Sequence, residues 1–169
     1  MSDPKEAAGA EEQTIYFARE IHQMNLMLGK FLQKSGADTV LLVDEVGHLV
    51  ARQGARSPAS EDTITALVAG MFSASHAMAQ MLGAEEFSSF ISVGGGGNLL
   101  LLRAGPRELL AVAFREDCAV TLVRTYALEV VRMLARILAR TTEARSQDSE
   151  IEGERFDSEI GDVLSDVFG

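Results

Sequence analysis

The run of four glycines from Gly94 to Gly97 is the segment whose composition is most typical of a chemical site. Glycine-rich loops bind phosphates, but a P-loop continues with a lysine and a serine or threonine at the start of a helix. Here the glycines are followed by NLLLLR, a strand-like segment that has neither side chain. A dinucleotide-binding fingerprint also opens a helix rather than a strand. The sequence therefore predicts a β-hairpin connection in which Asn98 assists the turn, and a phosphate site is the less favoured alternative.

The other residue types that perform chemistry do not form a catalytic or metal-binding pattern. The histidines have no metal-ligand spacing, so structural roles are expected for His22, His48 and His76. Cys118 is the only cysteine and belongs to no motif, which favours a small buried residue. Paired acids fall in predicted turns, where acidic residues are common. We therefore expect no catalytic site, no metal site and no cofactor, and hence a protein that is not itself an enzyme.

The elements that would position any site are predicted from hydrophobic periodicity. Apolar residues at helical spacing predict helices over residues 12–34, 61–82 and 119–142. Apolar runs between turn residues predict strands near residues 40–43, 49–50, 87–93, 98–103 and 108–115. Connections this short require antiparallel strands. The expected fold class is α/β of the α+β type, with the order α-β-β-α-β-β-β-α and an antiparallel sheet of about five strands.

The net charge of −10 is concentrated at the two ends of the chain. Residues 1–11 are predicted to form a disordered acidic arm, residues 12–142 a neutral domain, and residues 143–169 an acidic flexible tail. A neutral domain with acidic ends disfavours nucleic-acid binding, which needs a basic face. No apolar run is long enough to span a membrane. The polar, acidic start and the single cysteine favour a cytoplasmic protein without a secretory leader.

The predicted helix over residues 61–82 has two unusual faces. The first is a bulky apolar stripe that we expect to pack on the sheet, namely Ile64, Leu67, Met71, Ser75, Met78 and Leu82. The second is almost free of bulk and charge, namely Ala66, Ala69, Gly70, Ser73, Ala77 and Gln80. Small side chains allow a second helix to approach closely. This face therefore predicts contact with a twin subunit or another partner, and burial within one domain is the alternative.

These segments resemble the roadblock (dynein light chain) family over residues 12–142. The resemblance lies in the element order, the hairpin VLLVDEVGHLVARQG, the helix ITALVAGMFSASHAMAQMLG followed by EEF, and the closing segment ELLAVAFREDCAVTLVRTYALEVVRML. It implies a profilin-like sandwich that forms a homodimer through the second helix and the strand after it. The implied contact residues at or beside the dimer surface are Ala66, Ala69, Gly70, Ser73, Ala77, Phe87 and Phe90.

The features are similar to those of bacterial roadblock proteins that act as GTPase-activating regulators in cell polarity and motility. The resemblance implies that a homodimer binds one Ras-like small GTPase and remodels its switch regions without donating an arginine finger. Four arginines at loops or strand ends are candidates for such a finger, but nothing in the sequence distinguishes among Arg52, Arg56, Arg103 and Arg107. The glycine run departs from the family pattern. The alternative function is therefore a non-catalytic adaptor or scaffold for polarity or signalling proteins.

The end of the tail carries a short amphipathic motif. Its apolar residues share one helical face, with acids on the other, and are Phe156, Ile160, Val163, Leu164, Val167 and Phe168. An apolar stripe on an acidic tether is the form of a helix that binds in a groove. The motif is expected to contact a partner, and the alternatives are docking on its own domain or no specific contact. An arginine stripe on the last predicted helix contains Arg132, Arg136 and Arg140. Cations near a helix C-terminus favour a solvated face, and reception of the acidic linker is the alternative.

Overall fold

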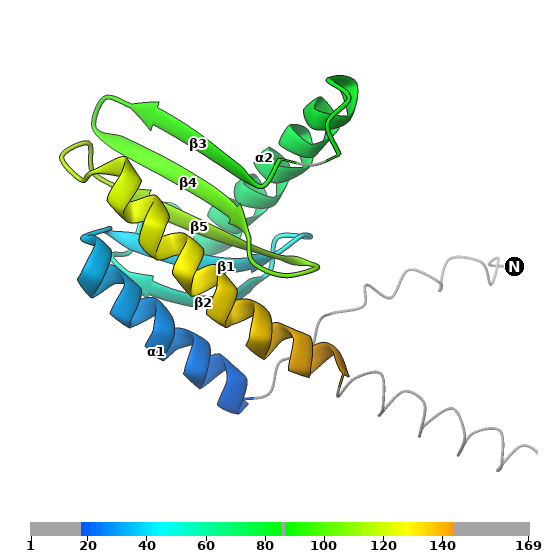
Figure 1. The fold of residues 1–169 in the computed structure, drawn as a ribbon. Coiled ribbons are helices and arrows are strands. Elements are labelled where there is room, and N and C mark those ends of the chain that lie inside the picture. Colours follow the sequence, from blue (N-terminus) through cyan, green and yellow to red (C-terminus); the bar gives the residue numbers. More distant parts are fainter. Residues whose placement is uncertain (1–17, 86, 144–169) are drawn as a thin grey trace, which may run out of the picture.

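The computed structural model describes residues 18–85 and 87–143 (Figure 1). Helix α1 (Ala18–Ser35) is followed by the hairpin strands β1 (Thr39–Asp44) and β2 (Leu49–Gly54). Helix α2 (Glu61–Met81) precedes three strands, β3 (Ser89–Gly94), β4 (Gly97–Arg103) and β5 (Glu108–Phe114). A C-terminal helix follows, described over residues 120–143. The predicted order α-β-β-α-β-β-β-α is confirmed.

The strands form one antiparallel sheet in the spatial order β2-β1-β5-β4-β3. The closing strand β5 lies between β1 and β4, which pairs the two hairpins into a single sheet. Strands β1 and β5 are buried along almost their whole length, as their nearly continuous apolar sequences indicate. Strand β3 pairs only with β4, so it is an edge strand that presents unpaired backbone groups.

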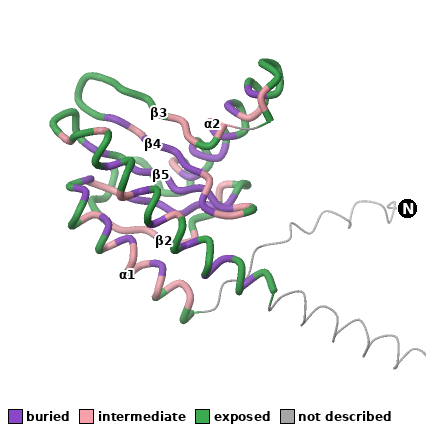
Figure 2. Tube along the Cα trace, viewed as in Figure 1, coloured by how far each residue is buried: buried purple, intermediate pink, exposed green. Residues whose placement is uncertain are grey.

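Helices cover the two faces of the sheet unequally (Figure 1). Helix α1 and the C-terminal helix pack on one face, where Phe31, Leu42 and Leu134 belong to the larger apolar core. Helix α2 packs on the opposite face through Val68 and Phe72. Figure 2 shows that buried residues concentrate in the central strands, whereas β3 and the far end of α2 are exposed.

The glycine run forms the predicted hairpin turn. Gly94 pairs with Gly97 across the β3–β4 ladder, which leaves two glycines as the loop. Gly96 has a φ of 93°, a conformation that side chains disfavour. The side chain of Asn98 accepts a hydrogen bond of 3.4 Å from the backbone N–H of Gly94, as its assisting role requires. The residues after the run continue as β4 and open no helix.

The predicted arm, residues 1–11, and nearly all of the predicted tail, residues 143–169, lie outside the described residues, so both predictions stay open. The same holds for the start of the first predicted helix, residues 12–17, and for the tail motif. Within the part of the chain that the structure describes, no helix is long and apolar enough to cross a membrane.

Candidate functional site

Helix α2 is positioned by a well-formed N-terminus. The side chain of Ser60 accepts a hydrogen bond of 3.3 Å from the backbone N–H of Thr63, which makes it the predicted N-cap. Glu61 and Asp62 occupy the first turn, where negative charge favours the helix dipole. The β1–β2 turn packs closely against the next turn of the helix. A Cβ added to Gly47 would lie only 3.1 Å from the Cα of Ala66, so the close approach depends on glycine at this position.

The face of α2 that packs on the sheet differs from the predicted one. The buried residues are Thr65, Val68, Ala69, Phe72, Ser75 and Ala79. Thr65 and Ser75 tolerate burial because their hydroxyls donate to the carbonyls of Asp62 and Phe72, at 3.2 and 2.8 Å. Of the predicted stripe, only Ser75 is buried, and Ile64 and Met71 are partly buried. The expectation for the rest of the stripe, Leu67, Met78 and Leu82, is wrong.

Half of the predicted stripe therefore faces solvent in the single chain. Leu67 is 62% exposed, Met78 58% and Leu82 71%, and the neighbouring Met81 is 88% exposed. The C-terminal end of α2, which contains Met78 and Met81 and is followed by Leu82, extends past the edge of the sheet (Figure 1). Large exposed apolar side chains that gather at one end of a helix, as Met78, Met81 and Leu82 do, are uncommon on a soluble monomer and mark an interaction surface.

Most of the small residues singled out in the sequence lie on the outer side of α2. Ala66, Gly70, Ser73 and Ala77 are exposed, and a Cβ on Gly70 would meet no atom within 4 Å. Ala69 is the exception, since it is only 8% exposed. The bulky stripe and the small-residue face are thus two adjacent surfaces of one helix, both open to solvent.

The edge strand β3 adds a backbone surface beside this helix. Phe87 precedes the strand and is half-buried, and Phe90 packs against the apolar cluster beneath α2. Val93 is 71% exposed and Ile91 41% exposed. The predicted pairing strand therefore exists and lies at an edge of the sheet, where a second chain can add to the ladder.

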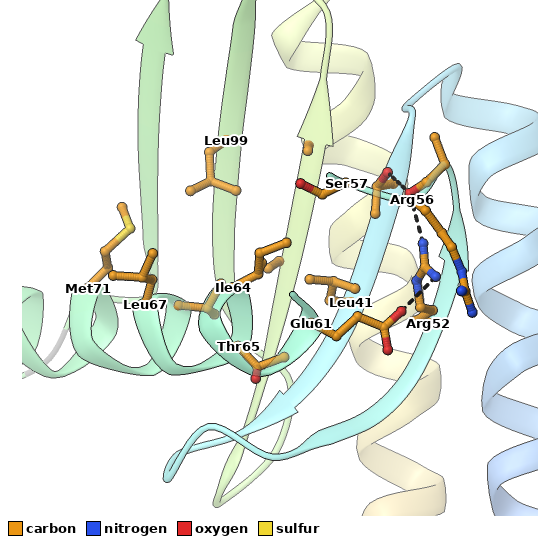
Figure 3. Close-up of a pocket in the computed structure, with 15 residues that line it drawn as sticks. Leu41, Arg52, Arg56, Ser57, Glu61, Ile64, Thr65, Leu67, Met71 and Leu99 are labelled. Atoms are coloured by element: carbon orange, nitrogen blue, oxygen red, sulfur yellow. Dashed lines mark hydrogen bonds and ion pairs between the residues drawn. The ribbon is translucent and has the colours of Figure 1, made fainter. Parts of the chain in front are cut away.

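An apolar groove of about 430 Å³ runs alongside α2 over the uncovered part of the sheet (Figure 3). Its floor includes Leu41, Leu99 and Ala111 from three neighbouring strands. Its wall is formed by the stripe side of α2, with Leu67 and Met71 pointing toward it (Figure 3). Leu67 therefore belongs both to the exposed residues of α2 and to the wall of the groove.

Charged groups close one end of the groove. The guanidinium of Arg52 bridges the carboxylate of Glu61 at 2.8 Å and the carbonyl of Ala55 at 2.9 Å (Figure 3). Arg56 also lines the groove and is exposed. Among the described residues it has no hydrogen-bonding or ion-pair partner. This end of the groove thus offers a positive charge next to an apolar wall.

The two other candidate arginines are engaged within the chain. The guanidinium of Arg103 lies 4.8 Å from the centre of the Phe72 ring and donates to the carbonyl of Pro106 at 2.9 Å. Arg107 pairs with Glu45 at 3.0 Å. Three of the four candidates, the third being Arg52, therefore already hold loops and strand ends in place.

His76 lies on α2, where its ring is 3.2 Å from the side-chain nitrogen of Gln80, whereas His48 and Cys118 support loops. His48 pairs with Asp44 at 2.9 Å, and Asp44 also accepts the backbone N–H groups of Val46 and His48, which orders the β1–β2 turn. Cys118 is half-buried rather than buried, and its thiol donates to the carbonyl of Gly36. Across residues 18–85 and 87–143, no three His, Cys, Asp or Glu side chains gather in a group that could hold a metal ion.

A model of the Roadblock/LC7 domain matches residues 24–114, more than half of the chain, so the chain belongs to the Roadblock/LC7 family. The family resemblance predicted from the sequence is confirmed, and so is the roadblock fold. No curated protein sequence matches the chain.

Among solved structures, the chain is similar to gliding protein MglB from Thermus thermophilus, with 28% identity and a TM-score of 0.69 over 74% of this chain and 95% of that chain. A structure of MglB in a tetrameric arrangement is 26% identical, with a TM-score of 0.72 over 76% of this chain and 97% of that chain. MglB from Myxococcus xanthus shares the fold at 24% identity, with a TM-score of 0.71 over 75% and 96% of the two chains.

Sequence reasoning missed the role of the bulky stripe and the groove. Met81 is not part of the stripe predicted from the sequence, although its side chain is the most exposed large apolar one among the described residues. A signal was present, because apolar residues occupy more of the circumference of α2 than one sheet face can cover. An excess of apolar faces indicates a second packing surface.

Proposed function

We propose that this protein is a homodimeric, cytoplasmic regulator that stimulates an MglA-type Ras-like small GTPase in bacterial cell polarity or motility. The observation that carries the proposal is the set of exposed apolar side chains on α2, with an apolar groove along its first half and the unpaired edge of β3 in the same sheet. Membership of the Roadblock/LC7 family and the similarity to MglB structures support it.

The homodimer is inferred because the projecting end of α2 and the groove beside the first half of α2 are both apolar and can pack against each other. A two-fold axis at the β3 edge pairs two β3 strands and sets two α2 helices antiparallel. The projecting end of one α2, with Met78, Met81 and Leu82, then enters the groove beside Leu67 of the partner. Methionine side chains suit such a groove because they adapt to irregular shapes.

The GTPase is assigned to the outer, small-residue face of α2. In the proposed dimer the stripe is covered by the second subunit, whereas Ala66, Gly70, Ser73 and Ala77 face away from the sheet. Two antiparallel helices then present a broad surface with small side chains, onto which a rigid protein surface can dock closely. Ala69 supports this face from below, as its burial indicates.

The regulator acts by repositioning the switch regions of the GTPase rather than by donating an arginine. Three of the four candidate arginines are held by contacts within the chain, which disfavours their insertion into another active site. The same observation favours the second candidate function, an adaptor dimer that binds polarity proteins without accelerating hydrolysis. An arginine finger is worth about 10³–10⁵ in rate, so its absence predicts a smaller acceleration.

The first experiment is single-turnover GTP hydrolysis by the MglA-type GTPase of the same cell, with and without this protein in excess. Acceleration supports the regulator, binding without acceleration supports the adaptor, and no binding refutes both. Ala77→Arg places a large cation on the outer face and should abolish acceleration while the dimer persists. The matched control Ala135→Arg lies on the exposed face of the C-terminal helix and should leave both properties unchanged.

A further inference from the structure

A second groove lies on the other side of the sheet from α2, and both apolar and polar side chains line it. It has a volume of about 320 Å³ and runs between the C-terminal helix and the outer strands β3 and β4. Ile91 and Leu100 line it from the strands, and Val120 and Leu128 line it from the helix. Ile91 is 41% exposed and Leu128 37% exposed, so the groove is open to solvent. The groove opens on the face of the sheet opposite α2 and borders the β3 edge.

A ridge of arginines leads along the C-terminal helix to this groove. Arg140, Arg136, Arg132 and Arg124 are exposed and lie at intervals of four or eight residues, which places them along one oblique row. The row begins beside α1, where Arg140 lies near Arg19 and Glu20, and it ends at Arg124, which lines the groove. Among the described residues, Arg124, Arg132 and Arg136 have no ion-pair partner.

We propose that the tail of the same chain occupies this groove, with its acidic linker on the arginine ridge and its apolar motif between β3 and the helix. The linker, residues 144–155, has a net charge of −2, since it carries four acids against two arginines, namely Asp148, Glu150, Glu152 and Glu154 against Arg145 and Arg155. The motif begins with Phe156 and Ile160, which are apolar side chains of the kind that the groove accepts. Along the tail, the acidic linker comes before the apolar motif. Along the surface, starting from the end of the C-terminal helix, the arginine ridge comes before the groove.

The lengths agree with this path. Along a helix with a rise of about 1.5 Å per residue, position 143 lies roughly 28 Å from Arg124. Residues 144–155 can span up to about 40 Å when extended, so they reach the groove with some slack. Arg132 and Arg136 lie between these two points.

In the free protein, docking in the groove keeps the tail motif away from other partners. A motif that lies in its own groove cannot contact a GTPase at the same time, so a partner must compete for it. The inference does not depend on the proposed GTPase function, because it concerns only contacts within one chain. Surface ion pairs are weakened by salt, so the docked state is expected to open as ionic strength rises.

Disulfide trapping in the full-length chain tests the proposal. In a Cys118→Ser background, Thr125→Cys marks the groove and Ile160→Cys marks the tail. The control pairs Ile160→Cys with Leu26→Cys, which is exposed on α1. A free tail reaches this site at least as easily, since α1 begins beside Arg140. A free tether gives only millimolar effective concentrations, so docking should make the Thr125 pair oxidise at least about tenfold faster than the control.

Charge reversal tests whether the arginine ridge attracts the tail, or whether the tail is trapped only because it is tethered nearby. Arg132→Glu combined with Arg136→Glu should slow trapping at Thr125 by between about twofold and tenfold, as expected for surface ion pairs. Lys30→Glu combined with Lys34→Glu makes the same charge change at the same spacing on α1 and should have no effect. Equal trapping at both sites, a disulfide that joins two chains, or equal effects of the two reversals would overturn the proposal. The mass of the oxidised species, and the dependence of its formation rate on protein concentration, distinguish a disulfide within one chain from one between two chains.

Discussion

Replacing Leu67 by alanine tests the dimer directly, because this side chain is 62% exposed in the single chain and covered in the proposed dimer. Burying a leucine side chain completely stabilises a protein by about 1.5–3 kcal/mol, so the newly covered part accounts for about 1–2 kcal/mol. The two-fold axis repeats the contact, so Leu67→Ala should remove about 2–4 kcal/mol from the dimer. This loss corresponds to a roughly 30- to 700-fold higher dissociation constant.

The assay is sedimentation equilibrium over a dilution series, with the thermal unfolding of each variant followed by circular dichroism. Leu26→Ala is the matched control, because Leu26 is 54% exposed on α1, on the other side of the sheet. Its dimer dissociation constant should stay within about twofold of the parent value, as is typical of a surface substitution. If Leu67→Ala also stays within this range, or if Leu26→Ala weakens the dimer equally, the assigned surface is wrong.

Three further predictions concern backbone and capping positions. Gly70→Ala should raise the free energy of unfolding by about 0.5–1 kcal/mol, since its Cβ meets no atom within 4 Å, and should weaken GTPase binding; thermal unfolding and titration check both. Gly54→Ala should lower the free energy of unfolding by at least about 1–2 kcal/mol in urea titrations, because Gly54 has a φ of 101° and a Cβ would collide with the carbonyl of Asp38. Ser60→Ala should lower it by about 1 kcal/mol through loss of the N-cap, and an unchanged urea midpoint would contradict this.

Local signals in the sequence were sufficient to predict the elements and their order. Ser60 as the N-cap, the turn at Gly94–Gly97 and the strands around it depend on neighbours in the chain, and each is confirmed. The role of Asn98 belongs to the same class, because its partner lies only four residues away. Such features are encoded by local backbone preferences, which single segments express without the rest of the fold.

The orientation of α2 could not be read from the sequence, because this helix has apolar or small side chains around most of its circumference. Val68 and Phe72 face the sheet because they fill the space above Leu101 and Leu109. Leu101 and Leu109 belong to strands that follow α2 in the chain, so the pattern within α2 does not show which of its side chains will pack on them. Periodicity identifies the apolar faces of a helix, but it does not predict which of these faces packs on the sheet.

The sequence by itself determined the family, the order of the elements, the hairpin at the glycines and the concentration of acidic charge at the two ends of the chain. Only the tertiary structure decided that Leu67 and Met78 face solvent beside a groove, and that arginines of the C-terminal helix lead to a second groove. The physical reason is that turns, caps and strands arise from interactions between near neighbours. A groove arises instead from the packing of distant segments, whose shapes become complementary only when the whole sheet has formed.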